Sequence, residues 1–152
     1  MSNNVLDKTD VTLLGAGCAS LSLASRANEL EDYDFTVIDP ETHLAQDHIW
    51  GFWQMPWLSA AVLISRKKWY NWKIITTDKA VLHTTEAFPY SAINRNDWIS
   101  DCFEKAIDNN VKFKRELTKE CSSQVLDSRP PKIPKDNMLQ HFVGYEIQAE
   151  KD

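Results

Sequence analysis

The chain has 152 residues, of which 43% are hydrophobic, and a net charge of −5. This length is typical of one folded domain that is large enough to bury a core. The acidic balance, with no basic cluster longer than residues 66–68, gives nucleic-acid binding little electrostatic support, so we expect no nucleic-acid partner.

Targeting signals and membrane spans are not expected either. Residues 1–10 are polar and acidic, unlike a secretory signal, and the longest apolar run, residues 58–64, is far shorter than the span of about 20 residues that a bilayer requires. The three cysteines form no C-x-x-C pair, which favours free thiols in a reducing cytoplasm. They are Cys18, Cys102 and Cys121.

The first 39 residues contain an apolar run, a glycine turn, a helix-forming stretch and a second apolar run. Residues 11–14 are typical of a strand buried on both faces. Gly15 permits a tight turn, and Gly17 lets the backbone approach a pyrophosphate without an intervening Cβ. We expect residues 18–30 to form a helix whose free N–H groups and positive dipole end point at the phosphates.

Asp39 closes the second apolar run, residues 35–38, about 20 residues past the glycines. A carboxylate there can accept hydrogen bonds from ribose hydroxyls. Ser20 stands where a third glycine is usual, a mild departure because that position serves close helix–strand packing. The sequence therefore predicts that Gly15, Gly17 and Ser20 bind the pyrophosphate of a dinucleotide and that Asp39 binds its ribose. The alternative is a purely structural strand–helix turn.

The middle of the chain predicts strands and then a helix. Residues 69–75 and 80–84 are typical of two strands joined by a turn. Asn94 is a good helix N-cap, and Asp97 lies near the capping-box position, so a helix is expected to run to about Asp108.

Further strands are expected after this helix. Val111 and Phe113 suit a third parallel strand, and Val111 with its neighbouring backbone is expected to border an adenine. Residues 125–126 and 138–147 are two more strand candidates. Strands that alternate with helices predict an α/β fold with a parallel sheet.

Several passages between residues 11 and 147 carry a more specific signal. They are the glycine motif at 14–21, Val-Ile-Asp at 37–39, His-Ile-Trp-Gly-Phe at 48–52, Tyr-Ser-Ala-Ile at 90–93, Asp-Ser-Arg-Pro at 127–130 and residues 140–146. Together they resemble the N-terminal part of a bacterial-type lycopene cyclase, a flavoprotein of carotenoid biosynthesis. The passage at 48–52 is the most specific match, whereas the glycine motif is shared with other flavoproteins.

The resemblance implies a Rossmann-like FAD-binding domain over residues 1–152, partial, with elements of an attached β-sheet substrate domain. It implies FAD in reduced form, with NAD(P)H as the electron source. The activity implied is a redox-neutral cyclisation of the ends of lycopene to β-type rings. It also implies a carotenoid substrate, a location in the cytoplasm with peripheral membrane contact, and His48 near the flavin.

The chain departs from the family pattern in two places. The family's acidic motif of adjacent glutamates has no counterpart, since Glu86 and Glu146 stand alone, so no catalytic residue is assigned. Residues 116–124 are short where the family would have extra strands. The resemblance therefore implies a truncated or internally deleted member that lacks a C-terminal half and does not cyclise lycopene alone. The alternatives are another FAD-dependent oxidoreductase or monooxygenase, and a non-catalytic remnant.

Some polar and aromatic residues allow two interpretations. The indoles of Trp50, Trp53 and Trp57 suit an apolar channel, a bilayer surface or core packing. Residues 66–68 suit anionic headgroups or a solvated face. Arg129 suits a phosphate, a domain interface or a local hydrogen bond to Asp127.

The histidines do not indicate a metal centre. His43 and His48 have no further Cys or His ligand nearby in the sequence, so no metal is expected.

Overall fold

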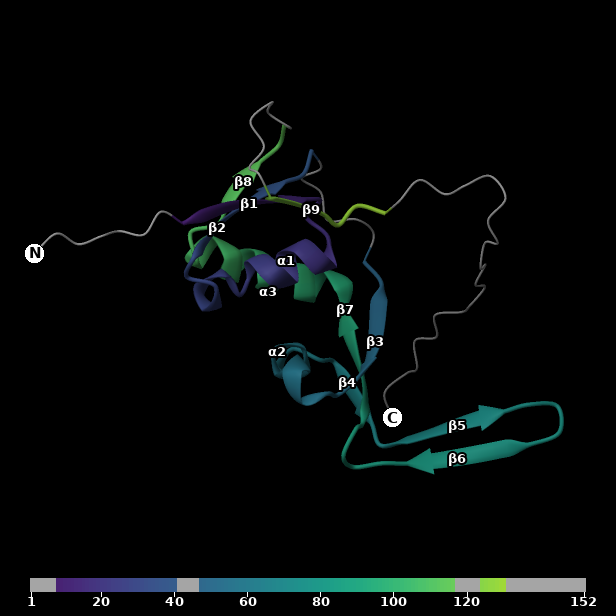
Figure 1. Cartoon of the computed structure of the whole chain (residues 1–152). Helices are drawn as coiled ribbons and strands as arrows, with labels where there is room; N and C mark the ends of the chain where they lie inside the picture. Colours follow the sequence, from purple (N-terminus) through teal and green to yellow (C-terminus); the bar gives the residue numbers. More distant parts are fainter. Residues whose placement is uncertain (1–7, 41–46, 117–123, 131–152) are drawn as a thin grey trace, which may run out of the picture.

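A four-stranded parallel sheet forms the frame of the structure. The computed structural model describes residues 8–40, 47–116 and 124–130 (Figure 1). The strand order is β8-β2-β1-β9, and every pairing is parallel. The strands are β1 (Thr9–Leu14), β2 (Tyr33–Ile38), β8 (Lys112–Lys114) and β9 (Gln124–Asp127). The predicted α/β class with a parallel sheet is confirmed.

Two helices cover one face of this sheet. Helices α1 (Cys18–Ala24) and α3 (Arg95–Asp108) lie side by side beneath the strands (Figure 1). Alternate residues of β1 and β2 point toward these helices, because successive side chains of a strand lie on opposite faces of the sheet. The register places Val11 of β1 beside Phe35 of β2, so the two side chains share one face.

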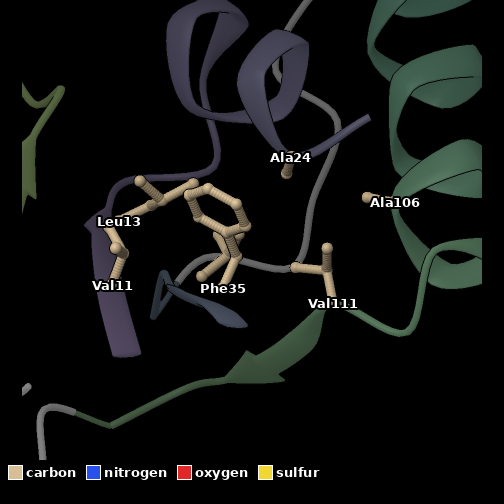
Figure 2. Close-up of a cluster of buried hydrophobic side chains, with 7 residues drawn as sticks. Val11, Leu13, Ala24, Phe35, Ala106 and Val111 are labelled. Carbon is tan, nitrogen blue, oxygen red and sulfur yellow. The ribbon is translucent and has the colours of Figure 1, made fainter. Parts of the chain in front are cut away.

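The main core lies between the sheet and the helices (Figure 2). Ala24 of α1 and Ala106 of α3 are completely buried, and such small residues let the helices approach the strands closely. Burial of a large apolar side chain here contributes about 1.5–3 kcal/mol. The buried cluster comprises Val11, Leu13, Ala24, Phe35, Val37, Ala106 and Val111.

A second, antiparallel part is inserted between β2 and α3. Its sheet has the order β3-β7-β4, formed by β3 (Ile49–Trp53), β7 (Tyr90–Asn94) and β4 (Lys67–Trp69). A short helix, α2 (Ser59–Leu63), follows the 3-10 turn η2 (Pro56–Leu58). The hairpin of β5 (Asn71–Ile75) and β6 (Ala80–Thr84) projects away from both sheets (Figure 1).

The first helix is shorter than the sequence predicts. It ends at Ala24 instead of residue 30, and the 3-10 turn η1 (Ala27–Glu29) follows. The Arg26 amide donates to the Leu23 carbonyl, which is a 3-10 contact, and the Ser25 carbonyl accepts a hydrogen bond from the Asn109 side chain at 2.9 Å. The carbonyl of Ser25, the C-cap of α1, is therefore satisfied by the C-cap residue of α3 and not by a further turn of its own helix.

The strand expected over residues 69–75 is interrupted. Lys67–Trp69 pairs with β7, whereas Asn71–Ile75 pairs with β6. Tyr70 lies between them, and its carbonyl accepts a hydrogen bond from the Thr85 amide at 2.9 Å. The two halves belong to different sheets because their partners differ.

The cap of α3 also differs from the prediction. Asn94 occupies the N-cap position, as expected, but its side chain makes no capping hydrogen bond. Asp47 supplies the acceptor instead, because its Oδ1 receives the Asn96 amide at 3.1 Å. The Asn94 amide oxygen accepts from Arg66 Nη1 at 2.9 Å, so its capping capacity is used elsewhere.

The remaining sequence predictions for this part have two outcomes. Val125 and Leu126 lie in β9, and Phe113 lies in β8, so both strands are confirmed. The strand expected at 138–147 lies outside the described residues. In the ranges that are described, no helix combines the length and the apolar character needed to cross a bilayer.

Candidate functional site

The loop that leaves the carboxyl end of β1 is shaped by Gly15. Its φ of +91° is a conformation that favours glycine, and its amide donates to the Ile38 carbonyl at 2.9 Å. A Cβ at this position would lie 3.1 Å from Arg129 Cγ and 3.2 Å from Ser128 Oγ. The backbone and the neighbours both require a glycine here, as the predicted tight turn demands.

Gly17 lies on the open side of the same loop. It is the N-cap of α1 with extended backbone, and a Cβ built on it meets no atom within 4 Å. The absence of a side chain therefore leaves space directly in front of the loop. A phosphate could approach the peptide groups here without a steric obstacle.

Asp39 is brought next to this loop by the pairing of β1 with β2. Its Oδ2 accepts a hydrogen bond from the Ala16 amide at 2.5 Å, and its own amide donates to the Lys114 carbonyl at 3.0 Å. The half-buried carboxylate thus holds the glycine loop at the carboxyl edge of the sheet. The juxtaposition of Gly15, Gly17 and Asp39 agrees with the sequence pattern. Their contacts with a nucleotide remain predictions.

Ser20 lies beneath the loop and not on its open side. Its side chain is buried, and its Oγ donates to Ser128 Oγ at 2.8 Å, which donates in turn to the Leu14 carbonyl at 3.0 Å. This relay of hydroxyl groups ties α1 to the segment after β9 and to the end of β1. Sequence reasoning missed Ser128, although it belongs to the Asp-Ser-Arg passage. The contact of Ser20 with a pyrophosphate remains a prediction.

Arg129 makes the local hydrogen bonds that were one of its three interpretations. Its Nε and Nη2 donate to Asp127 Oδ1 and Oδ2 at 2.8 and 2.7 Å, and its amide also donates to Oδ1. These hydrogen bonds lower the pKa of Asp127 to about 2. Because Arg129 Cγ also lies against Gly15, the pair places a fixed guanidinium at the edge of the glycine loop.

Removing this guanidinium is expected to raise the pKa of Asp127. With Arg129→Ala, the pKa should return toward the ordinary value of 3.8. A depressed folded-state pKa means that the pair stabilises the fold above the ordinary pKa, and that this contribution is lost as the pH falls toward about 2. Titration of the Asp127 carboxyl carbon by NMR measures the change.

A second exposed pair provides the matched control for this titration. Glu29 receives hydrogen bonds from Arg26, which lower its pKa. Arg26→Ala should raise the pKa of Glu29 and leave Asp127 unchanged. An Asp127 pKa that stays depressed in Arg129→Ala would contradict the assigned pairing.

The His-Ile-Trp-Gly-Phe passage joins the inserted sheet to the main body. His48 is exposed, its Nε2 accepts a hydrogen bond from Trp50 Nε1 at 2.9 Å, and its carbonyl accepts from the Arg95 amide. Trp50 packs against a second buried cluster formed by Leu21, Ile99 and Cys102. The proximity of His48 to a flavin remains a prediction.

The three tryptophans therefore divide between the interpretations. Trp50 packs against the core, Trp53 is 38% exposed and contacts other rings, and Trp57 is 73% exposed. Only Trp50 clearly follows the core-packing interpretation.

Val111 does not border the glycine loop. It precedes β8, at the amino end of a strand parallel to β2, and its side chain is buried in the main core (Figure 2). The glycine loop follows the carboxyl end of β1, at the opposite edge of the sheet. The expectation that Val111 borders the adenine therefore does not agree with the parallel topology.

The part of the chain that the structure describes contains two cysteines, and both are free thiols. Cys18 is free and exposed beside Gly17, whereas Cys102 is free and buried, and burial raises the pKa of the Cys102 thiol. Among residues 8–40, 47–116 and 124–130, no group of three His, Cys, Asp or Glu side chains is placed to hold a metal ion. His43 and Cys121 lie outside these ranges.

Several solved structures have a similar fold to that of this chain. They include 2-methyl-3-hydroxypyridine-5-carboxylic acid oxygenase (TM-score 0.55, 14% identity) and CtdE in complex with FAD and substrate (TM-score 0.53, 18% identity). A third is FqzB (TM-score 0.51, 16% identity). Each match covers 70% of this chain and 31%, 30% and 28% of the respective structure. The likeness shows a common fold. This chain spans less than a third of the length of each of these structures.

Sequence comparison gives the family. No curated protein sequence matches the chain. The sequence model of the family described as lycopene cyclase protein matches residues 10–121. This match runs from β1 through the glycine loop, Asp39 and the inserted sheet to β8. Because it covers most of the chain, the protein belongs to the lycopene cyclase family.

Proposed function

We propose that this chain is the FAD-binding part of a lycopene cyclase-like flavoprotein. The observation that carries the proposal is the glycine loop, which is open in front of Gly17 and flanked by Asp39. Family membership and the shared fold with CtdE, which binds FAD, support this choice of dinucleotide.

The residues present fit the cofactor. The Gly17 amide and the amides that open α1 would hold the pyrophosphate, since no Cβ fills the space before Gly17. The amides of Gly15 and Ala16 instead hold the loop in shape through the Ile38 carbonyl and Asp39. Asp39 would orient the ribose while its Oδ2 holds the Ala16 amide. Arg129, fixed by Asp127 beside Gly15, would add positive charge at the edge of this site.

The chemistry follows from the family. Reduced FAD, with NAD(P)H as its electron source, would supply an electron-rich ring for the redox-neutral cyclisation of lycopene ends to β-type rings. No pair of adjacent glutamates, the residues expected to manage the proton, occurs in these 152 residues, so we expect that these residues alone do not cyclise lycopene. β-Carotene formed by this chain alone would contradict that expectation.

Binding of FAD to the full chain tests the proposal. We expect near-stoichiometric binding of FAD, followed by flavin absorbance and fluorescence, and much weaker binding of FMN, which lacks the adenosine and pyrophosphate. Alkylation of Cys18, which directly follows Gly17, should slow when FAD is added.

Two controls make this experiment decisive. Addition of ADP should also slow Cys18 alkylation, because it contains the part of FAD that the loop binds. The buried Cys102 should remain unreactive throughout, which confirms that the chain is folded. Equal affinity for FMN and FAD, or no binding of either, would contradict the proposed cradle.

A further inference from the structure

The guanidinium of Arg129 uses only one of its two edges within the described part of the chain. Its Nε and Nη2 form the edge that faces Asp127, at 2.8 and 2.7 Å from the two carboxylate oxygens. A guanidinium carries five N–H donors in a rigid plane, so the edge formed by Nη1 and Nη2 keeps three of them. The side chain is 57% exposed, which leaves this second edge, the free edge, open to solvent.

Contacts with the glycine loop fix the position of Arg129. A Cβ at Gly15 would lie 3.1 Å from Arg129 Cγ and 3.7 Å from the Arg129 amide nitrogen, so the stem of the side chain packs on the loop. The amide and the hydroxyl of Ser128 both donate to the Leu14 carbonyl at 3.0 Å, which ties the preceding residue to the end of β1. An anion at the free edge therefore meets an arginine that is already ordered.

Arg129 and Asp39 lie on opposite sides of the glycine loop. β1 is placed between β2 and β9, Asp39 directly follows β2, and Arg129 lies two residues after β9. Because the three strands are parallel, their carboxyl ends meet at one edge of the sheet. A nucleotide with its ribose at Asp39 and its first phosphate before Gly17 would therefore extend its second phosphate toward the side of Arg129.

The free edge has the geometry that a phosphate requires. Two parallel N–H donors match two oxygens of one phosphate, and such charge-assisted hydrogen bonds are about twice as strong as neutral ones. Asp127 balances part of the charge of Arg129, so the arginine acts mainly through the direction of its donors. Its position beyond the loop selects the second phosphate and not the first.

We propose that Arg129 makes the nucleotide site selective for a diphosphate, because its free edge binds the phosphate farther from the adenosine. This inference rests on the proposed function, since it requires a nucleotide at the glycine loop. It assigns the preference for ADP and dinucleotides over AMP to one side chain. The Gly17 amide and the opening of α1 hold the nearer phosphate, which all of these nucleotides share.

Calorimetric titration of the full chain with ADP and with AMP at neutral pH tests the assignment. The unmodified chain should bind ADP at least about tenfold more tightly than AMP, the scale of one charge-assisted hydrogen bond. Arg129→Met, whose stem can still pack on Gly15, should lose about tenfold in affinity for ADP and less than about twofold for AMP. Arg129→Lys keeps the charge without the planar fork and should recover only part of the loss.

Two further variants separate phosphate recognition from indirect effects. Removal of the guanidinium leaves the Asp127 carboxylate unpaired, and this charge alone would repel a second phosphate. In Arg129→Met with Asp127→Asn the charge is absent, so ADP should still bind only about as tightly as AMP. Arg26→Ala breaks an equivalent pair, in which Nε and Nη2 face the Glu29 carboxylate, and should change neither affinity.

The outcomes distinguish this inference from the proposed function. If the unmodified chain binds neither FAD nor ADP, both are overturned. If ADP binds and Gly17→Val weakens ADP and AMP alike, the nucleotide site stands. The role of Arg129 is then overturned by an unmodified chain without preference for ADP, or by Arg129→Met with an unchanged ratio of the two affinities.

The double variant gives one more decisive outcome. Recovery of the preference for ADP in Arg129→Met with Asp127→Asn would overturn the assignment, because repulsion by Asp127 would then explain the loss in Arg129→Met. Near-ultraviolet circular dichroism verifies the fold of each variant. A changed ratio of ADP to AMP affinity in a folded variant is not expected from a purely structural role of Arg129, since a distorted loop would weaken both nucleotides.

Discussion

Gly17→Val is expected to lower the affinity for FAD by about a hundredfold or more, which corresponds to about 2.7 kcal/mol. A Cβ at Gly17 contacts no other atom within 4 Å, so the valine would occupy only the open space that we propose for the pyrophosphate. The unfolding free energy of the chain without FAD should change by less than about 1 kcal/mol, the scale of an N-cap substitution. Titration with FAD and chemical denaturation measure the two effects.

Gly15→Ala is the matched control, and its main effect should be on the unfolding free energy and not on FAD binding. A left-handed conformation and close contacts with Ser128 and Arg129 oppose a side chain there, so the chain should lose about 1–3 kcal/mol of stability even without FAD. If Gly17→Val bound FAD as tightly as the unmodified chain does, the pyrophosphate site that we propose at the glycine loop would be disproved.

Gly51→Ala is expected to cost about 1–3 kcal/mol of stability, as overpacking of a filled site typically does. Gly51 lies opposite Ala92, and the Tyr90 ring covers it so closely that an added Cβ would overlap the hydroxyl and the ring. Tyr90 would have to move, which would separate its ring from Trp53 and Trp69. Denaturation gives the loss of stability, and near-ultraviolet circular dichroism reports the change in the aromatic row.

A double-mutant cycle isolates this contact. In a Tyr90→Leu background the ring is absent, so Gly51→Ala should cost much less than it does in the unmodified chain. The coupling energy between the two sites should therefore approach the cost of the single Gly51 substitution. Additive effects would show that Tyr90 does not determine the requirement for glycine.

The sequence alone determined the order of the elements that build the glycine loop and its flanking strands. The strand before Gly15, the strand before Asp39 and the glycines themselves follow local patterns of hydrophobicity and backbone freedom. Parallel pairing of these strands then brings Asp39 to the loop, because carboxyl ends of neighbouring parallel strands meet at one edge. The parallel sheet was predictable for this reason, whereas the family resemblance depended on further passages, above all residues 48–52.

Only the tertiary structure decided which distant groups complete these local features. The hydroxyls of Ser20 and Ser128, which form a hydrogen bond, are 108 residues apart in the sequence. Asp47 accepts from the Asn96 amide of α3 across 49 residues. Asn109 donates to the Ser25 carbonyl across 84 residues. Periodicity describes which face of an element is apolar, but it does not specify which remote polar group meets an unpaired amide or carbonyl. Which remote group pairs with an unpaired amide or carbonyl depends on how α1, α3 and the inserted sheet pack. For this reason only the tertiary structure revealed the end of α1 at Ala24, the capping of α3 by Asp47 and the hydrogen bonds of Ser128.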